Sequence, residues 1–368
     1  MFSKSQSSTF LDMPMRIAHL VLEKMDPMDQ LSARKACQKL KTAVDEVGIR
    51  FNKITIKLEK DLIRVELDVD KPYGKCIQYR DESTLNRIVK NLWNGQQVDP
   101  ETIGTIVIFS SGRRTRIEKE NFVQTVCRDL KILLKHAESV EIHSNQARRE
   151  WRSYRNDYID RHFTTELAKL EECFHIKEIC LISFWEEYVL RMLSLFDATT
   201  LQSIAFCENP DLSFDKIIQL DQWKNIKEFK LRRRDGWFDS NMLAYLVDLQ
   251  SFTIEQTWLS FPIQCVVQIR DDVMRRSTFQ SCTVQFGLHY TERIDFIEIA
   301  KVFKPEYAGG NEFEIVYSND DDKFMIKCQK FLSNDWWDGF CFCVKRLSSD
   351  DFLHIKNYFD SIFIEPAL

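Results

Sequence analysis

The sequence predicts a mixed protein of the α+β and α/β classes: a helical N-terminus, a β meander, and a long array of alternating strands and helices. Three observations support this class. Residues 13–44 carry apolar side chains at helical spacing, residues 51–80 alternate polar and apolar residues, and similar strand-like phrases recur from residue 105 onward. The 368 residues suffice for two units, and 44% hydrophobic with 29% charged residues is typical of a globular protein.

The N-terminal segment predicts three short helices. Pro14 suits a first-turn position, and Ile17, Leu20 and Val21 follow it at helical spacing. A capping Asp26 followed by proline predicts a brief second helix. The third helix has an apolar stripe made of Ala33, Ala36, Cys37, Leu40 and Val44. About 45 residues are too few to bury a core of their own, so such a unit needs a further surface to complete it.

These helices resemble an F-box. The positions that match the family motif are Met13-Pro14, Ile17, Val21-Leu22, Met25-Asp26-Pro27, Asp29, Leu31, Arg34, Ala36-Cys37 and Leu40. The resemblance implies binding to the Skp subunit of a cullin–RING ubiquitin ligase. Carried over residue by residue, it implies a Skp-facing set of Pro14, Ile17, Val21, Leu22, Leu31 and Cys37. The residues alone leave open a small helical cap that packs on the following domain.

The next segment predicts a small antiparallel meander. Strands are expected over 53–58, 62–69 and 75–79, with a tight turn at 59–61, and a helix is expected over 83–94. This meander is well placed to cover the first edge of whatever sheet follows.

From residue 105 the strands resemble one another. They are expected over 105–111, 139–145, 176–184, 201–209, 226–234, 249–257 and 280–287. The first core residues Ile179, Ile204, Phe229 and Phe252 are 25, 25 and 23 residues apart, which is near the period of leucine-rich repeats, although no asparagine ladder recurs. We therefore expect an irregular leucine-rich-repeat-like α/β solenoid with parallel strands. It should end in a β hairpin (312–318 and 323–329), a strand over 340–344 and a helix over 350–362.

The predicted organisation is a disordered N-terminus (1–12), a helical segment (13–50) and a region over 51–368. The last divides into the meander (51–80), strand–helix repeats (81–290) and a C-terminal hairpin and helix (291–368). This order is similar to that of nematode F-box proteins with a C-terminal FTH domain. The resemblance implies a non-catalytic adaptor, whose F-box holds Skp and whose FTH region holds a target protein.

The expected target surface lies on the outer face of the array. If the aligned core residues are buried, their neighbours point outward. The candidate target-binding residues are His143, Ile182, Cys207, Lys230, Arg232 and Glu255. A mixed stripe of this kind suits a protein or peptide ligand. A one-residue shift of register would exchange the two sets, and a loop over the row would hide part of it.

Three basic clusters offer a nucleic-acid interface as an alternative. They are Arg113, Arg114 and Arg116; Arg148, Arg149, Arg152 and Arg155; and residues 232–234. Positive side chains would contact phosphates, but acidic residues lie close by and the net charge of −5 attracts no polyanion. We therefore favour solvated basic faces.

Catalytic and metal-binding motifs are not found. The sequence contains no phosphate-binding loop, dinucleotide fingerprint, zinc-protease motif or nucleophile elbow. Cys341 and Cys343 have no second pair for zinc, and residues 320–322 lack the spacing of a calcium loop. We expect no enzymatic activity, no cofactor and no metal.

The 11 cysteines are odd in number and lie in apolar segments, which is typical of reduced thiols. No signal peptide or membrane-spanning run is evident. We expect a cytoplasmic or nuclear protein that serves as a substrate-recognition adaptor of an SCF-type (Skp–cullin–F-box) ubiquitin ligase. The alternative is a repeat scaffold that binds a protein partner outside ubiquitin transfer.

Overall fold

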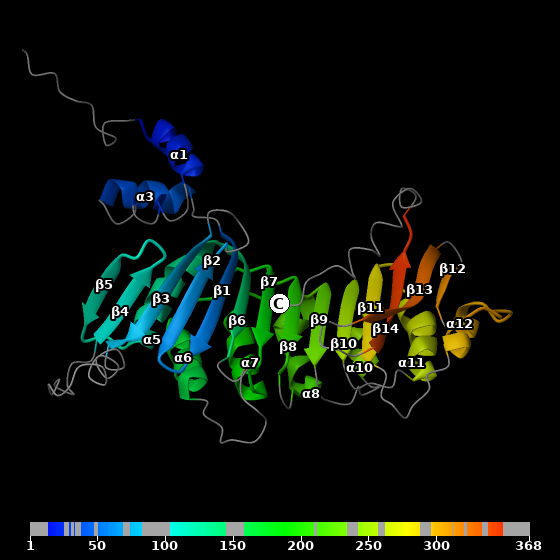
Figure 1. Cartoon of the computed structure of the whole chain (residues 1–368). Helices are drawn as coiled ribbons and strands as arrows, with labels where there is room; N and C mark the ends of the chain where they lie inside the picture. Colours follow the sequence, from blue (N-terminus) through cyan, green and yellow to red (C-terminus); the bar gives the residue numbers. More distant parts are fainter. Residues whose placement is uncertain are drawn as a thin grey trace, which may run out of the picture. The chain divides into compact units, whose positions relative to one another are not determined.

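The fold comes from a computed structural model (Figure 1). The structure describes residues 14–25, 29–30, 33, 38–47, 51–68, 74–82, 104–144, 158–209, 212–233, 242–256, 262–287, 296–310, 312–319, 322–332 and 338–348. The chain divides into two compact units, Met1–Thr200 and Leu201–Leu368.

The first unit begins with a pair of helices. Helix α1 (Met15–Lys24) packs against α3 (Gln38–Val47). Pro14 lies just before α1, one position earlier than the sequence predicts, and its carbonyl accepts bonds from the N–H groups of Ile17 and Ala18. The buried apolar residues of the pair are Ala18, Leu22, Ala43 and Val44. Most of the predicted second helix lies outside the described residues, although residues 29, 30 and 33 are helical.

Gln30 closes the C-terminal end of α1. Its side-chain Nε2 donates hydrogen bonds to the carbonyls of Leu22 (2.7 Å) and Met25 (3.2 Å), and the residue is only 5% exposed. The last carbonyls of a helix have no partner within the helix, so these bonds replace solvent. Gln30→Ala is expected to cost about 1–2 kcal/mol locally and to speed amide hydrogen exchange in α1 by roughly 5- to 30-fold. The exposed Gln38→Ala is the control; equal exchange in both variants would contradict this role.

Beyond this pair, the described residues of the first unit form seven strands. They are β1 (Phe51–Glu59), β2 (Leu62–Leu67), β3 (Lys75–Asp81), β4 (Gly104–Phe109), β5 (Arg114–Glu118), β6 (Ala137–His143) and β7 (Glu178–Ile182). Their order is β7-β6-β1-β2-β3-β4-β5. Strands β1 to β5 pair antiparallel in succession, whereas β6 pairs parallel with both β1 and β7. The meander therefore lies beside the parallel strands, as the sequence predicts.

The meander is longer than predicted. We expected it over 51–80, with the strand at 105–111 in the parallel array, but β4 pairs antiparallel with β3 and with the unpredicted β5. The β4–β5 pair is antiparallel because a tight turn joins the two strands, in which Gly112 adopts a φ of 81° and donates to the Phe109 carbonyl. A parallel pair would need a crossover of a dozen or more residues, for which this turn leaves no room.

Helices cover one face of this sheet. They are α5 (Phe122–Leu133), the 3₁₀ turn η2 (Leu134–His136), α6 (Tyr158–Ala168) and α7 (Glu186–Leu193). Helix α5 contacts β2, β3 and β4, and α6 contacts β1. The Tyr79 hydroxyl of β3 donates to Asp129 of α5 (2.8 Å). The other face of the described strands carries polar side chains such as Lys57, Arg64 and Glu66.

In the part of the second unit that the structure describes there are also seven strands. They are β8 (Ser203–Cys207), β9 (Glu228–Arg233), β10 (Ser251–Gln256), β11 (Ser281–Gly287), β12 (Phe313–Asn319), β13 (Asp322–Leu332) and β14 (Asp338–Arg346). Its helices are α8 (Phe214–Ile217), α9 (Asp221–Asn225), α10 (Met242–Leu246), α11 (Ile263–Gln268) with the π-helical η4 (Ile269–Val273), and α12 (Phe296–Phe303). Strands β8 to β11 are parallel, and β14, β13 and β12 continue antiparallel from β11.

The predicted register of this unit is confirmed. Ile204, Phe229 and Phe252 are direct neighbours across β8, β9 and β10, and all three are buried. The predicted C-terminal hairpin is confirmed as β12 and β13, and β14 pairs with both β13 and β11. The predicted disordered segment 1–12 and the predicted helices over 83–94 and 350–362 lie outside the described residues. The leucine-rich-repeat-like solenoid stays a prediction.

Candidate functional site

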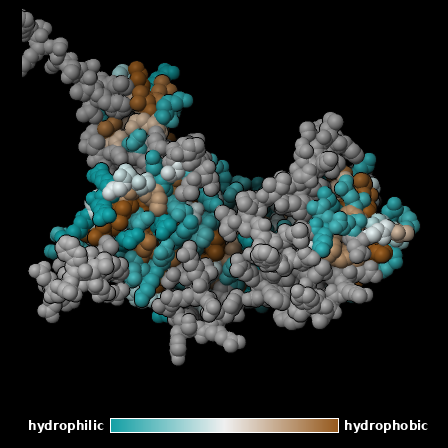
Figure 2. All heavy atoms as spheres, in the orientation of Figure 1, coloured by the Kyte–Doolittle hydropathy of each residue, from teal (hydrophilic) through white to brown (hydrophobic). Residues whose placement is uncertain are grey.

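Three large apolar side chains of α1 lie at the surface. Ile17 is 48% exposed, Leu20 56% and Val21 38%. The spacing of these residues places them on one side of the helix, whereas Ala18 and Leu22 face the interior. Figure 2 shows hydrophobic atoms at the surface of this helical segment. Helix α1 thus has two apolar sides, and α3 covers only one. We call Ile17, Leu20 and Val21 the α1 stripe.

The predicted Skp-facing set divides into three groups. Pro14, Ile17 and Val21 are exposed, so their side chains are available to a partner. Leu22 is fully buried, so it supports the helix pair and offers no surface in the folded chain. The remaining two, Leu31 and Cys37, lie outside the described residues.

Leu20 was missed as a surface residue. It is the most exposed member of the α1 stripe and lies one helical turn from Ile17. The helical spacing identified it as apolar, but the matched motif positions did not include it. Only the packing of α3 shows which apolar side of α1 is left uncovered.

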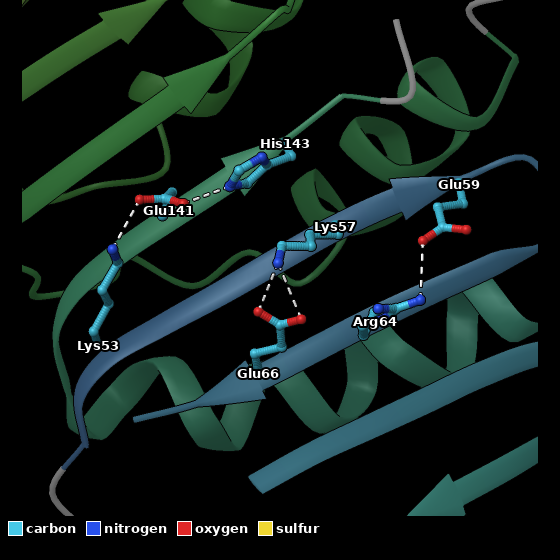
Figure 3. A network of polar contacts seen from close by, with 7 residues as sticks. All are labelled: Lys53, Lys57, Glu59, Arg64, Glu66, Glu141 and His143. Carbon is cyan, nitrogen blue, oxygen red and sulfur yellow. Dashed lines mark hydrogen bonds and ion pairs between the residues drawn. The ribbon is translucent and has the colours of Figure 1, made fainter. Parts of the chain in front are cut away.

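The outer face of the first unit carries a network of ion pairs (Figure 3). His143, Lys57 and Arg64 lie in one row across β6, β1 and β2. Lys57 and Arg64 are like charges directly opposite one another, which is unfavourable, and each side chain of this row has an acidic partner on the same face. The contacts are His143 with Glu141, Lys57 with Glu66 (2.8 Å), and Arg64 with Glu59 (3.4 Å).

Glu141 is the most enclosed member of this network. Its side chain is 9% exposed, and Lys53 Nζ lies 2.9 Å from Oε2 while His143 Nε2 contacts Oε1. Burial alone would raise the pKa of Glu141, but the bonds from His143 and Lys53, and then the charge of Lys53, outweigh it and lower the pKa to about 2.

This pKa gives a pH-dependent prediction. A carboxyl whose pKa is lowered on folding stabilises the protein fully above its unfolded pKa of 4.5, and this contribution is lost as the pH falls towards about 2. At pH 7, Glu141→Gln is expected to lower the free energy of unfolding by about 1–2 kcal/mol relative to the wild type. This difference should shrink between pH 4.5 and pH 2. Denaturant titrations across this range measure it. Exposed Glu178→Gln is the control, and a difference independent of pH would contradict the prediction.

The structure brings together the candidates of each unit. In the first unit, His143 and Ile182 are neighbours across β6 and β7. In the second unit, Cys207, Arg232 and Glu255 form one row across β8, β9 and β10. All five are half-buried and lie on the face opposite the aligned core residues Ile179, Ile204, Phe229 and Phe252. Their role in target binding stays a prediction.

An ion cluster joins three of the second-unit candidates. Glu255 lies 3.1 Å from Lys230 Nζ and 3.5 Å from Arg232 Nε, so one carboxylate holds two cations of the neighbouring strand. The 20% exposure of the Glu255 side chain contrasts with 40% for Lys230 and 34% for Arg232. The side chains of Lys230 and Arg232 are therefore more accessible than the carboxylate that they share.

The cysteine pair and the basic clusters were the other candidate sites. Cys341 and Cys343 are buried with their sulfurs 3.3 Å apart, and among the described residues no three or more metal-ligating side chains gather at one place. Arg148, Arg149, Arg152, Arg155 and Arg234 lie outside the described residues. In the part of the chain that the structure describes, no helix has the length and apolar character needed to span a membrane.

Comparison with known proteins gives two family matches. An F-box domain matches residues 10–52, and an FTH domain matches residues 159–306. The curated F-box A protein 224 from Caenorhabditis elegans is 22% identical over 331 residues, which is 87% of this chain and 77% of that protein. No solved structure matches the chain. The resemblance to nematode F-box proteins with an FTH domain is thus confirmed.

Proposed function

We propose that this chain, an F-box protein with an FTH domain, is a non-catalytic substrate-recognition adaptor of an SCF-type ubiquitin ligase. One observation carries the proposal. Within the segment that matches the F-box, the α1 stripe leaves three large apolar side chains uncovered. Removing apolar surface from water is worth about 25 cal/mol per Å², so a partner that covers the stripe gains affinity directly. The partner that fits this segment is the Skp subunit.

The proposed Skp contact is centred on Leu20, with Ile17, Val21 and Pro14 around it. Leu31 and Cys37 belong to the proposed set through the family motif. Leu22 supports this contact indirectly, because its buried side chain helps hold α1 against α3. An interface of this kind places its apolar anchors centrally and leaves charged neighbours such as Arg16 and Lys24 at the rim.

The proposed mechanism is positional. A target held on the adaptor stays beside the ubiquitin-charged enzyme that the cullin–RING assembly recruits. This raises the effective concentration of the target's lysines and turns an encounter between two molecules into one within a complex. We propose that the target binds the outer sheet faces, at His143 and Ile182 in the first unit and at Cys207, Lys230, Arg232 and Glu255 in the second. No side chain of the adaptor then needs to react.

The same proposal places the protein in the cytoplasm, the nucleus or both, where ubiquitin ligases of this type work. All ten described cysteines are free thiols, which suits a reducing compartment.

The test is affinity purification of the intact chain from cells, followed by identification of its partners. The adaptor proposal expects Skp and cullin subunits in amounts comparable to the bait, together with one or more further proteins. A repeat scaffold would recover other partners without Skp or cullin, and that result would reject the proposal. Repeating the purification with Ile17→Asp, which alters only an exposed position, should remove Skp and cullin together.

A further inference from the structure

Strand β5 lies at one end of the strand order of the first unit. Among the described residues its only strand neighbour is β4. Four of its five residues, from Arg114 to Arg116 and Glu118, are exposed, so neither face of the strand is closely covered. It lies between the two segments that match known families. An edge strand with no described strand on its far side can pair with another extended chain.

The hairpin geometry shows which backbone groups of β5 face the open edge. The Phe109 N–H donates to the Arg113 carbonyl (2.9 Å), so Arg113 faces β4. Backbone direction alternates along an antiparallel strand, so Thr115 and Ile117 also face β4. The N–H and C=O groups of Arg114 and Arg116 therefore point away from β4, towards the open edge.

The side chains of the same two arginines lie on the outer face of the sheet. Arg114 is opposite Ile108 and Arg116 is opposite Ile106, and both isoleucines lie on the face that also bears the charge network of Figure 3. The Arg113 side chain points to the opposite face by the alternation of the strand. Arg114 and Arg116, two positions apart, thus each combine backbone N–H and C=O groups that point away from β4 with a side chain on the outer face.

The two arginines differ in their existing partners. Arg116 is held by Glu82 (2.6 Å) and Glu118 (3.1 Å); the hydrogen bond to Glu82, and then the charges of Glu82 and Glu118, raise the pKa of its guanidinium. Among the described residues, Arg114 has no hydrogen-bond or ion-pair partner. Within the described part of the chain, the Arg114 guanidinium is therefore available to an acidic group, whereas the Arg116 guanidinium is already shared by two carboxylates.

We propose that β5 is a docking edge for an acidic, extended peptide of a target protein, which adds to the sheet as an antiparallel strand. Residues that oppose Arg114 and Arg116 lie about 5.5 Å away between Cα atoms, and they are two positions apart in the peptide. Acidic residues at those two positions meet the arginines on the outer face. The peptide therefore has the pattern acid–any–acid. A neutral or basic residue lies two positions before the first acid, where it is opposite Glu118. Only the description of the peptide as part of a target rests on the proposed function.

The test uses fluorescence anisotropy with the intact chain. The probe is a labelled peptide of sequence Thr-Val-Glu-Val-Glu-Val, and the control peptide Thr-Glu-Val-Val-Glu-Val has the same composition with its acids on opposite faces of a strand. The probe is expected to bind more tightly than the control. Arg114→Glu should weaken the probe about tenfold, since attraction becomes repulsion. Changing the probe's second glutamate to lysine should restore binding to this variant.

Arg113→Glu is the matched control, because it makes the same charge change at the neighbouring exposed residue on the other face. It should leave the affinity for the probe within about twofold. Equal losses with Arg113→Glu and Arg114→Glu, equal binding of the two peptides, or tighter binding of a single-stranded oligonucleotide than of the probe would overturn the proposal. Leu20→Asp, which removes the proposed Skp contact, should bind the probe normally. A failure of the Skp proposal is therefore distinguished from a failure of the proposed peptide site on β5.

Discussion

Leu20→Asp is expected to cause the largest loss of affinity of the chain for the Skp subunit. The side chain is 56% exposed, so the substitution places a carboxylate at the surface without disturbing the pair of helices. In the complex the same carboxylate would be buried with no partner. Loss of a central apolar anchor typically costs 2–4 kcal/mol, which corresponds to about 30- to 1,000-fold in affinity. Isothermal titration of the purified variant against the Skp subunit measures it.

The control for this prediction is Thr42→Asp, which adds the same charge at an exposed position of α3. It is expected to bind within a few-fold of the wild type. Unchanged binding by a folded Leu20→Asp chain would remove α1 from the interface. Leu22→Asp gives no such information, because Leu22 is fully buried and a charge there would disrupt the packing of α1 on α3.

Phe229→Ala is expected to cause the largest loss of stability in the second unit. Phe229 is 2% exposed and packs edge-on against Phe206, Phe214 and Trp223, with ring centroids 5.8, 5.6 and 5.0 Å away. Removing a buried phenylalanine ring leaves a cavity and typically costs 3–5 kcal/mol. Denaturant unfolding monitored by tryptophan fluorescence should report the loss, since Trp223 belongs to the same cluster.

Val316→Ala is the control for this second prediction. Val316 lies in the same unit and is 54% exposed, so its truncation should change the free energy of unfolding by no more than about 0.5 kcal/mol. A loss below about 1 kcal/mol for Phe229→Ala would mean that the aromatic cluster does not hold β9 to its helices.

Much of the second unit could be predicted from the sequence, because alternation and repetition act together there. Ile204, Phe229 and Phe252 recur at near-constant spacing, and one register places all of them in the core. The same register places Lys230, Arg232 and Glu255 on the other face. Their ion cluster could not be predicted, since it depends on which rows of neighbouring strands lie opposite one another.

The first unit was harder to predict for two physical reasons. Strand β5 has five residues, mostly charged, and carries almost no apolar pattern, so only the turn at Gly112 indicates a hairpin. Helix α1 has apolar residues on two sides, and its own spacing cannot show which side α3 covers. For that reason Leu22 was placed in the partner-facing set and Leu20 was left out.

The most direct test of the adaptor is reconstitution from purified components. The intact chain, the Skp subunit and the cullin are mixed and separated by size-exclusion chromatography, and each fraction is analysed for all three. The account predicts that the chain elutes with the cullin only when Skp is present, and that Leu20→Asp elutes alone. A folded wild-type chain that remains separate from Skp at micromolar concentrations would contradict it.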